Sequence, residues 1–235
     1  MKYVVYVAGI HHHSFYSSLS NRETNHHLTY QVTTTRLLSF APMDTTAFKT
    51  TPFYSEVIDG GAITCDLPVG WKDVSEIRQV PDHQEVYVGP GDDDPCFIIE
   101  ILEHQESVPD ETAAKYFFED LAAANGSSKT SFSDQEAVAP ADGSAPLTMF
   151  AGVGMQRFGK GRDRDGNGVT PQPNQDEVDV EIELCVIRLP QVQTDLLLTM
   201  SRNKGRCSSD TMKLSGEFQR ALSTIQILDW DLFGS

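Results

Sequence analysis

The alternation of apolar and polar residues becomes regular only from Ile58 onward. Residues 1–55 are rich in Ser, Thr and His and show no sustained period of 2 or 3.6 residues. Beyond them, runs of apolar, β-branched and aromatic residues are separated by Gly, Pro and Asp, which is typical of strands joined by turns. We therefore predict strands at residues 62–67, 85–88, 96–102, 147–158, 177–189 and 196–200.

The run at 177–189 shows the clearest two-residue period. Apolar residues occupy alternate positions from Val178 to Val186, and the positions between them begin with Glu177, Asp179, Glu181 and Glu183. Successive side chains of a strand point to opposite faces, so we expect one buried face and one face with acids about 7 Å apart. This acidic stripe fits either a solvated sheet face or a surface for a cation or a basic partner.

Two segments have helical periodicity. The first, at 110–124, opens with two acids and ends before Asn125-Gly126, a pair that tolerates left-handed backbone geometry. The second, at 209–228, has apolar residues at steps of three and four. The predicted buried stripes are Ala113, Ala114, Phe117, Phe118 and Leu121 in the first helix, and Leu214, Phe218, Ala221, Leu222, Ile225 and Leu228 in the second.

Strands framed by two helices predict a single α+β domain at residues 56–235. We expect residues 1–55 to be a poorly patterned N-terminal extension. Within the domain, residues 159–175 are rich in Gly, Asp, Pro and Asn and lack periodicity. This composition predicts a long Gly/Asp-rich loop between two strands.

The negative charge of the chain belongs to the predicted domain. The formal net charge is −16, from 34 acidic and 18 basic side chains. Residues 1–55 contain four Lys or Arg and two acids, so residues 56–235 contain the other 14 basic and 32 acidic side chains. Such a field repels phosphate backbones and anionic lipid. We expect a protein partner with a basic face, and neither nucleic acid nor a membrane.

Cysteine usage and hydropathy indicate a soluble intracellular protein. Cys65, Cys96, Cys185 and Cys207 are widely spaced without a C-x-x-C pair, so we expect reduced thiols rather than disulfides or a zinc site. No run approaches the roughly 18 to 20 apolar residues of a membrane span. The opening MKYVVYVAGI continues into histidines rather than into the small residues of a signal-cleavage site.

Candidate catalytic groups are few. The chain contains none of the motifs G-x-x-x-x-G-K-[ST], G-x-S-x-G, H-E-x-x-H and G-x-G-x-x-G. His83 and His104, the two histidines beyond the extension, lie beside carboxylates, an arrangement that fits either a general base or an ordinary acidic surface. We expect no catalytic residue and no cofactor.

A partial calcium-loop motif occurs in the predicted long loop. Residues 163–168 read Asp-Arg-Asp-Gly-Asn-Gly, the first six positions of an EF-hand loop. The twelfth position is Asn174 instead of Glu, and Pro171 and Pro173 stand where the exiting helix would form. We expect no metal site here. A calcium-responsive binder using Asp163, Asp165 and Asn167 remains part of the alternative function, an adaptor for some other protein.

The segment at 80–86, Val-Pro-Asp-His-Gln-Glu-Val, differs from the rest in character. Pro81 imposes an extended entry, and Asp82 and Glu85 are presented in a turn that leads directly into a strand. Asp82 can either cap this turn or contact a partner, and the pattern alone leaves both interpretations open.

This segment and several others together resemble the Ran guanine nucleotide release factor family. They keep the family's order over about 175 residues. The matching segments are Gly60-Gly61-Ala62-Ile63, Leu67-Pro68, Asp73-Val74-Ser75, Arg78, Val80-Pro81-Asp82, Gln84-Glu85-Val86, Phe118-Glu119-Asp120-Leu121, Arg188-Leu189-Pro190-Gln191, Gln193-Thr194-Asp195-Leu196-Leu197-Leu198 and Asp231-Leu232-Phe233-Gly234.

The resemblance implies a fold and a role. The implied fold is that of the PsbP protein, a central, mostly antiparallel sheet between helices. Family members bind the small GTPase Ran, promote release of its guanine nucleotide and act in nuclear transport without covalent chemistry of their own. The resemblance thus implies a monomeric, non-catalytic protein of the nucleus and cytoplasm.

The resemblance also implies which residues contact Ran. The paired acids of the family's P-D-x-Q-E-V motif are Asp82 and Glu85 here, with Gln84 beside them. Glu119 and Asp120, in the helix motif, are weaker candidates. Arg188, Pro190, Thr194 and Asp195 also match, and we interpret them as residues that shape a turn between two strands.

Overall fold

The computed structural model describes residues 46–55, 60–75, 79–90, 95–133, 135–139, 147–159, 177–203 and 212–234. The predicted Gly/Asp-rich loop, the calcium-like segment at 163–168 and the histidines of the extension lie outside these residues, except for Gly159 at the loop's start. The helices and strands given below all belong to one compact unit of the chain.

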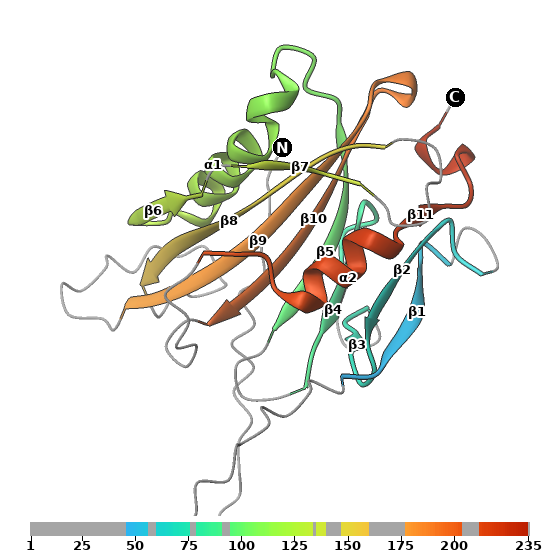
Figure 1. Cartoon of the computed structure of the whole chain (residues 1–235), viewed down its shortest axis with the longest axis horizontal. Coiled ribbons are helices and arrows are strands. Elements are labelled where there is room, and N and C mark those ends of the chain that lie inside the picture. Colours follow the sequence, from blue (N-terminus) through green and yellow to red (C-terminus); the bar gives the residue numbers. More distant parts are fainter. Residues whose placement is uncertain are drawn as a thin grey trace, which may run out of the picture. The chain divides into compact units, whose positions relative to one another are not determined.

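An eight-stranded sheet forms the centre of this unit (Figure 1). Its order is β3-β4-β5-β10-β9-β8-β6, and β7 pairs with β8 beside β6. Each pair is antiparallel. The strands are β3 (Lys72–Asp73), β4 (Gln84–Val88), β5 (Cys96–Glu103), β6 (Lys129–Phe132), β7 (Glu136–Val138), β8 (Thr148–Gly159), β9 (Glu177–Leu189) and β10 (Thr194–Asn203).

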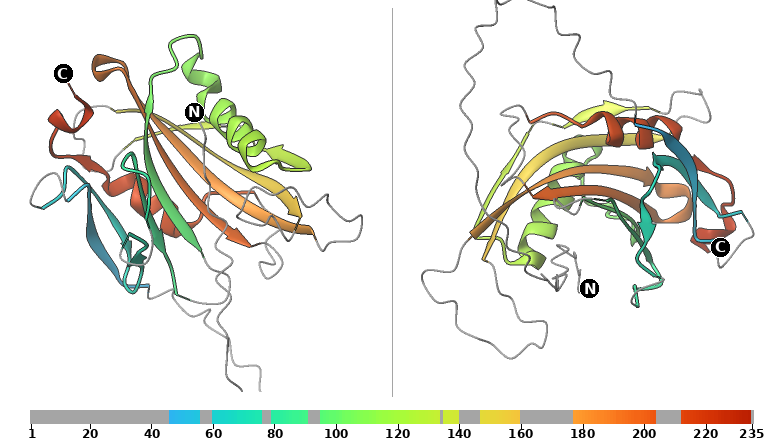
Figure 2. Two further views of the ribbon diagram at one scale, coloured as in Figure 1. Left: turned by 180° about the vertical axis from the view of Figure 1, so that it is seen from behind. Right: turned by 90° about the horizontal axis from the view of Figure 1, so that it is seen from below.

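A helix and a small sheet cover one face of the large sheet. The small sheet has the order β1 (Phe48–Phe53), β2 (Ile63–Pro68) and β11 (Gln226–Ile227), and the helix is α2 (Gly216–Thr224). Figure 2 shows both on the same side of the sheet. The core between them includes Phe53, Ile63, Phe97, Ile187, Leu198 and Phe218.

Helix α1 (Ala113–Asn125) covers the opposite face, over β8 and β9. It follows a 3₁₀ turn at Asp110–Thr112 and ends at Gly126, whose φ of 61° is left-handed. This confirms the predicted helix and its Asn-Gly end. The five residues of its predicted stripe are all buried, and they pack with apolar side chains of β9.

Two glycines of β8 let aromatic side chains lie directly on the strand. The ring of Phe118, from α1, lies so close to Gly154 that a Cβ there would be 2.3 Å from it. Gly152 faces the ring of Phe132 in the same way, at 2.4 Å. The two rings contact each other, with centroids 4.8 Å apart. The Phe118 and Phe132 rings, from α1 and β6, therefore pack together over β8 at positions where only glycine leaves enough room.

The second helix is shorter than predicted. It begins at Gly216, because the Ser215 hydroxyl oxygen caps it by accepting the backbone N–H of the third helical residue at 3.2 Å. It ends at Thr224, because Ile225 is extended (φ −65°, ψ 133°) and leads into β11. Leu228 consequently lies beyond the helix and is 57% exposed, so its predicted burial in the helical stripe is wrong. The predicted core residues Phe218, Ala221, Leu222 and Ile225 are buried.

The six predicted strands all occur, but five others were not predicted. Strand β1 lies inside the segment expected to be an unpatterned extension, and its Thr51 and Phe53 are buried. The acidic stripe of β9 is solvated only in part, because Glu183 is 1% exposed and lies against the N-terminal end of α2. Contacts with other elements thus bury polar residues of β1 and β9 that the residue pattern alone predicts to be exposed.

We predict that Gly154→Ala lowers the free energy of unfolding by about 1 to 3 kcal/mol, because the added methyl group would overlap the Phe118 ring and the Ser131 carbonyl oxygen, 2.8 Å away. Gly216→Ala is the matched control, since nothing lies within 4 Å of a Cβ at the start of α2. It should leave stability unchanged or raise it by up to about 1 kcal/mol. Urea denaturation of both variants checks the expectation, and equal stability of the two would contradict it.

Candidate functional site

The segment singled out at 80–86 forms a tight turn that enters β4. The Pro81 carbonyl oxygen accepts the backbone N–H of Gln84 at 2.9 Å, which closes the turn. Asp82 and His83, at the two central positions, are exposed. The turn therefore presents Asp82 to solvent, and the hydrogen bond that closes it runs between backbone atoms.

Gln84 and Glu85 point to opposite faces of the sheet, since they are neighbours in a strand. The Glu85 carboxylate accepts a hydrogen bond from the backbone N–H of Tyr54, which follows β1. Tyr54 has a φ of 57°, left-handed geometry that is unusual for a tyrosine. Its buried hydroxyl group donates to the His83 carbonyl oxygen at 3.1 Å. Tyr54 thus connects β1 to both ends of the 83–85 segment.

On the other face, Gln84 meets a buried carboxylate. Its side-chain N–H donates to Glu100 of β5 at 2.7 Å, and the His83 Nε2 lies 3.4 Å from the same carboxylate. Burial raises the pKa of Glu100 above its usual range, although the Gln84 hydrogen bond and the nearby His83 act in the opposite direction. The charge of Asp120, on α1, raises this pKa further. The structure therefore brings together Gln84, His83 and Glu100, and the charge of Asp120 acts on Glu100.

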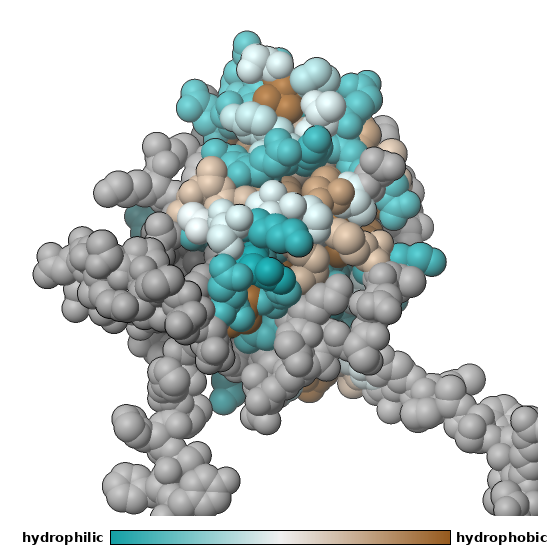
Figure 3. All heavy atoms as spheres, turned by 90° about the vertical axis from the view of Figure 1, so that its left-hand side faces the viewer, coloured by the Kyte–Doolittle hydropathy of each residue, from teal (hydrophilic) through white to brown (hydrophobic). Residues whose placement is uncertain are grey.

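Glu119 lies apart from this group. Its side chain is 60% exposed and forms an ion pair with Lys115, one turn earlier in α1, at 3.7 Å. Hydrophilic and apolar residues are interspersed on the side of the molecule shown in Figure 3.

The five predicted contact residues differ in exposure. Asp82 and Glu119 are exposed, Glu85 and Asp120 are partly buried, and Gln84 is buried.

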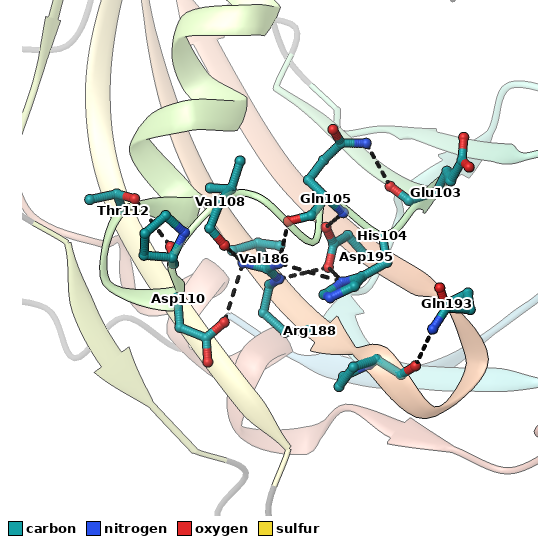
Figure 4. Close-up of polar contacts among 12 residues, drawn as sticks. Glu103, His104, Gln105, Val108, Asp110, Thr112, Val186, Arg188, Gln193 and Asp195 are labelled. Carbon is teal, nitrogen blue, oxygen red and sulfur yellow. Dashed lines mark hydrogen bonds and ion pairs between the residues drawn. The ribbon is translucent and has the colours of Figure 1, made fainter.

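A second polar group lies at the end of the sheet, where β9 and β10 meet the β5–α1 connection (Figure 4). The buried Arg188 donates from Nε to the buried Asp195 carboxylate at 2.8 Å. Its other nitrogens donate to the carbonyl oxygens of Gln105 and Val108. Asp195 also accepts the Gln105 backbone N–H at 2.9 Å. These contacts confirm that Arg188 and Asp195 shape the structure.

The two candidate general bases have different surroundings. The Nδ1 of His104 lies 2.8 Å from Asp195, and its side chain is only 10% exposed. His83 is 45% exposed. No group of three His, Cys, Asp or Glu side chains among the described residues could hold a metal ion. In the same part of the chain, no helix has the length and apolar character needed to cross a membrane.

Sequence reasoning missed Glu100 and Tyr54 as parts of this site. Glu100 interrupts the apolar run Cys-Phe-Ile-Ile-Glu-Ile-Leu at 96–102, on the same strand face as Ile98 and Leu102. A carboxylate at a buried position of a strand is a signal that could have been recognised. Tyr54 gave no such signal, because the residue that it contacts, Glu85, is 31 positions away in the sequence.

The fold has a solved counterpart. The crystal structure of the Ran-binding protein Mog1p of Saccharomyces cerevisiae is similar with a TM-score of 0.60 and 23% identity, covering 81% of this chain and 100% of that one. Both the structure and that likeness define an α+β protein built on a mostly antiparallel sheet.

Sequence comparison identifies the family. Residues 58–203 match the family described as "Ran-interacting Mog1 protein". The Ran guanine nucleotide release factor of Danio rerio is 30% identical over 191 residues, which cover 77% of this chain and 100% of that protein. The nuclear import protein mog1 of Schizosaccharomyces pombe is 39% identical over 70 residues, which cover 30% of this chain and 37% of that protein. The chain belongs to the Mog1 family.

We predict that Asp195→Ala lowers the free energy of unfolding by about 3 to 5 kcal/mol, because it removes the buried carboxylate from the Arg188 guanidinium and leaves only the half-exposed Asp110, at 3.3 Å. Asp179→Ala is the control. It breaks the two-hydrogen-bond contact with Arg157, which is partly open to water and so should cost much less. Urea unfolding at neutral pH measures both. Similar losses in the two variants would contradict the structural role of the buried pair.

We further predict that Glu100→Gln becomes more stable relative to the wild type as pH rises. With a raised pKa, folded Glu100 keeps its proton at pH values where the unfolded chain has released it. The wild type therefore loses stability as pH rises from the ordinary carboxyl pKa through the raised one, and the variant lacks this loss. Urea midpoints from about pH 4 to pH 8 measure the difference. A difference that stays constant over this range would contradict the prediction.

Proposed function

We propose that this protein binds Ran, promotes release of its guanine nucleotide and thereby supports nuclear import. Membership of the Mog1 family carries the proposal. It is supported by the names of the relatives, which include a Ran guanine nucleotide release factor and a nuclear import protein. The acidic surface is consistent with a partner that has a basic face.

The proposed contact surface is centred on Asp82 and Glu85, with Gln84, Glu119 and Asp120 around them. The exposed position of Asp82 supports this choice, because the backbone closes the turn and leaves its carboxylate available. Glu85 has a second task, since its carboxylate holds the Tyr54 backbone. A basic side chain of Ran that reaches Glu85 would share that carboxylate with the Tyr54 N–H.

Nucleotide release needs no active site in this protein. Binding preferentially to Ran without nucleotide lowers the affinity of Ran for nucleotide by the same factor, because the two binding equilibria are linked. Such couplings are typically about 1 to 3 kcal/mol. Carboxylates on a turn that a backbone hydrogen bond closes can form ion pairs with Lys or Arg near the nucleotide-binding loops of a GTPase. The protein then acts as a non-catalytic regulator.

Four finer features complete the proposal. The unit has the layer arrangement of the PsbP protein, with a central sheet between helices. It acts as a monomer in the nucleus and cytoplasm, without nucleic acid or membrane partners. Residues 1–55 contribute an extension in which the part from β1 onward joins the fold. Residues 159–175 form a loop between two strands of the sheet.

We predict that Asp82→Ala and Glu85→Lys each weaken Ran binding by about 2 to 5 kcal/mol, because each removes one partner of an interfacial charge pair. Calorimetric titration with Ran measures the affinity. Release of labelled GTP and GDP measures the activity of the same proteins, together with the double variant Asp82→Ala, Glu85→Ala.

The control is Glu136→Ala, an exposed acid on β7 at the opposite end of the large sheet. Ran should release its labelled nucleotide as fast with this variant as with the wild-type protein. Because Glu85 also holds Tyr54, the melting temperature of each Glu85 variant must be measured, and Asp82→Ala gives the cleaner result. Unchanged affinity of folded Asp82→Ala would refute the surface, and absence of binding by the wild type would refute the function.

A further inference from the structure

One buried carboxylate differs from the others in its partners. The described residues include four buried acids. Three of them have an arginine nitrogen within 3 Å, and the fourth, Glu100, has only Gln84 and His83. The arginine pairs are Asp66 with Arg220 at 2.7 Å, Glu183 with Arg202 at 2.9 Å and Asp195 with Arg188 at 2.8 Å.

One acceptor beside Glu100 has no donor. Gln84 is 5% exposed, and its side-chain oxygen is the single buried side-chain N or O atom of the described residues that has no hydrogen-bond partner. The nitrogen of the same amide donates to Glu100, so the oxygen belongs to the same small group of atoms. Asp120 adds a second negative charge nearby. A buried acceptor without a donor is destabilising, so a ligand that supplies N–H donors would be favoured here.

We infer that Glu100 and Gln84, with Asp120 beside them, form a site that accepts an arginine side chain of the partner protein. This inference rests on the proposed function and adds a specific ligand to it. The guanidinium group of the partner would donate to the Glu100 carboxylate and to the free oxygen of Gln84. It would thereby give Glu100 the arginine that the other three buried acids already have within this chain.

A guanidinium group fits better than a metal ion or a lysine. Its planar fork carries five N–H donors, so it can serve a carboxylate and an amide oxygen at once. A lysine ammonium is more strongly hydrated and more costly to bury. The described residues provide no group of three His, Cys, Asp or Glu side chains for a metal.

The site adjoins the proposed contact surface. His83, between Asp82 and Gln84, is 45% exposed and lies 3.4 Å from Glu100. His83 is thus the exposed side chain that lies between the solvent and the Glu100 carboxylate, and in the proposed complex it would move aside to admit the arginine. An arginine that enters there would lie next to Asp82, so both acids would serve one basic patch of Ran.

The test compares Glu100→Gln with Glu136→Gln, the same chemical change at an exposed acid on β7. Glu100→Gln keeps the shape of the side chain and removes a buried charge, so it should fold at neutral pH, which urea unfolding verifies. Its affinity for Ran should fall about 30-fold or more, because a buried interfacial charge pair is lost. The Glu136→Gln affinity should equal that of the wild type. Equal Ran affinity of Glu100→Gln and wild type would overturn the inference.

A second measurement keeps the inference separate from the proposed function. N-acetyl-L-argininamide is titrated into ¹⁵N-labelled full-length protein while the Gln84 side-chain amide signals are followed, with neutral N-acetyl-L-citrullinamide as the control. We expect a saturable shift with the arginine compound that is absent in Glu100→Gln. If the wild type fails to bind Ran, the function is refuted and this titration alone decides the site. No Glu100-dependent shift would then overturn it.

Discussion

The buried pair of Arg188 and Asp195 holds strands β9 and β10 against the connection between β5 and α1. It joins β9 to β10 beside a 3₁₀ turn, where Pro190 begins the turn and Thr194 donates to the Val192 carbonyl oxygen at 2.9 Å. The same guanidinium group also holds the connection that leads into α1. Arg188 also forms an ion pair with Asp110, in the 3₁₀ turn before α1, at 3.3 Å, so one buried guanidinium group holds both strands and the start of the helix. A charge so deeply buried is tolerated because its donors are matched by acceptors.

The buried acids of the described residues differ in whether this chain itself supplies an arginine for them. An acid with an internal arginine is satisfied and fixes the contact between two elements, as Glu183 does when Arg202 and the N-terminal end of α2 meet it. A buried acid without an internal arginine has no permanently charged cation to balance its carboxylate. Glu100 belongs to the second kind, and it lies beside the turn that the family motif marks. The four buried acids of the described residues are therefore divided between three that an internal arginine pairs and one that has only neutral or titratable partners.

Much of the fold followed from local patterns, and the misses have identifiable causes. The long alternation of β9 and the spacing in α1 placed those elements almost to the residue, because burial on one face dominates both patterns. Strands β6 and β7 are short and largely exposed, so they carry too little apolar signal. Strand β1 has the sequence Phe-Lys-Thr-Thr-Pro-Phe, whose two adjacent threonines resemble the Ser- and Thr-rich residues upstream and give no two-residue period. The early end of α2 depends on the extended backbone of Ile225 and its continuation into β11, which pairs with β2.

The site was predictable only where sequence neighbours form it. Asp82, Gln84 and Glu85 were found through their motif, whereas Glu100 and Tyr54 join them through contacts over 16 and 31 positions. This has a practical consequence for inhibitor design. A linear peptide copied from residues 80–88 would lack the tyrosine that anchors Glu85 and the carboxylate that orients Gln84, so it would reproduce the letters of the motif without its shape. A useful mimic must carry β1, β4 and β5 together.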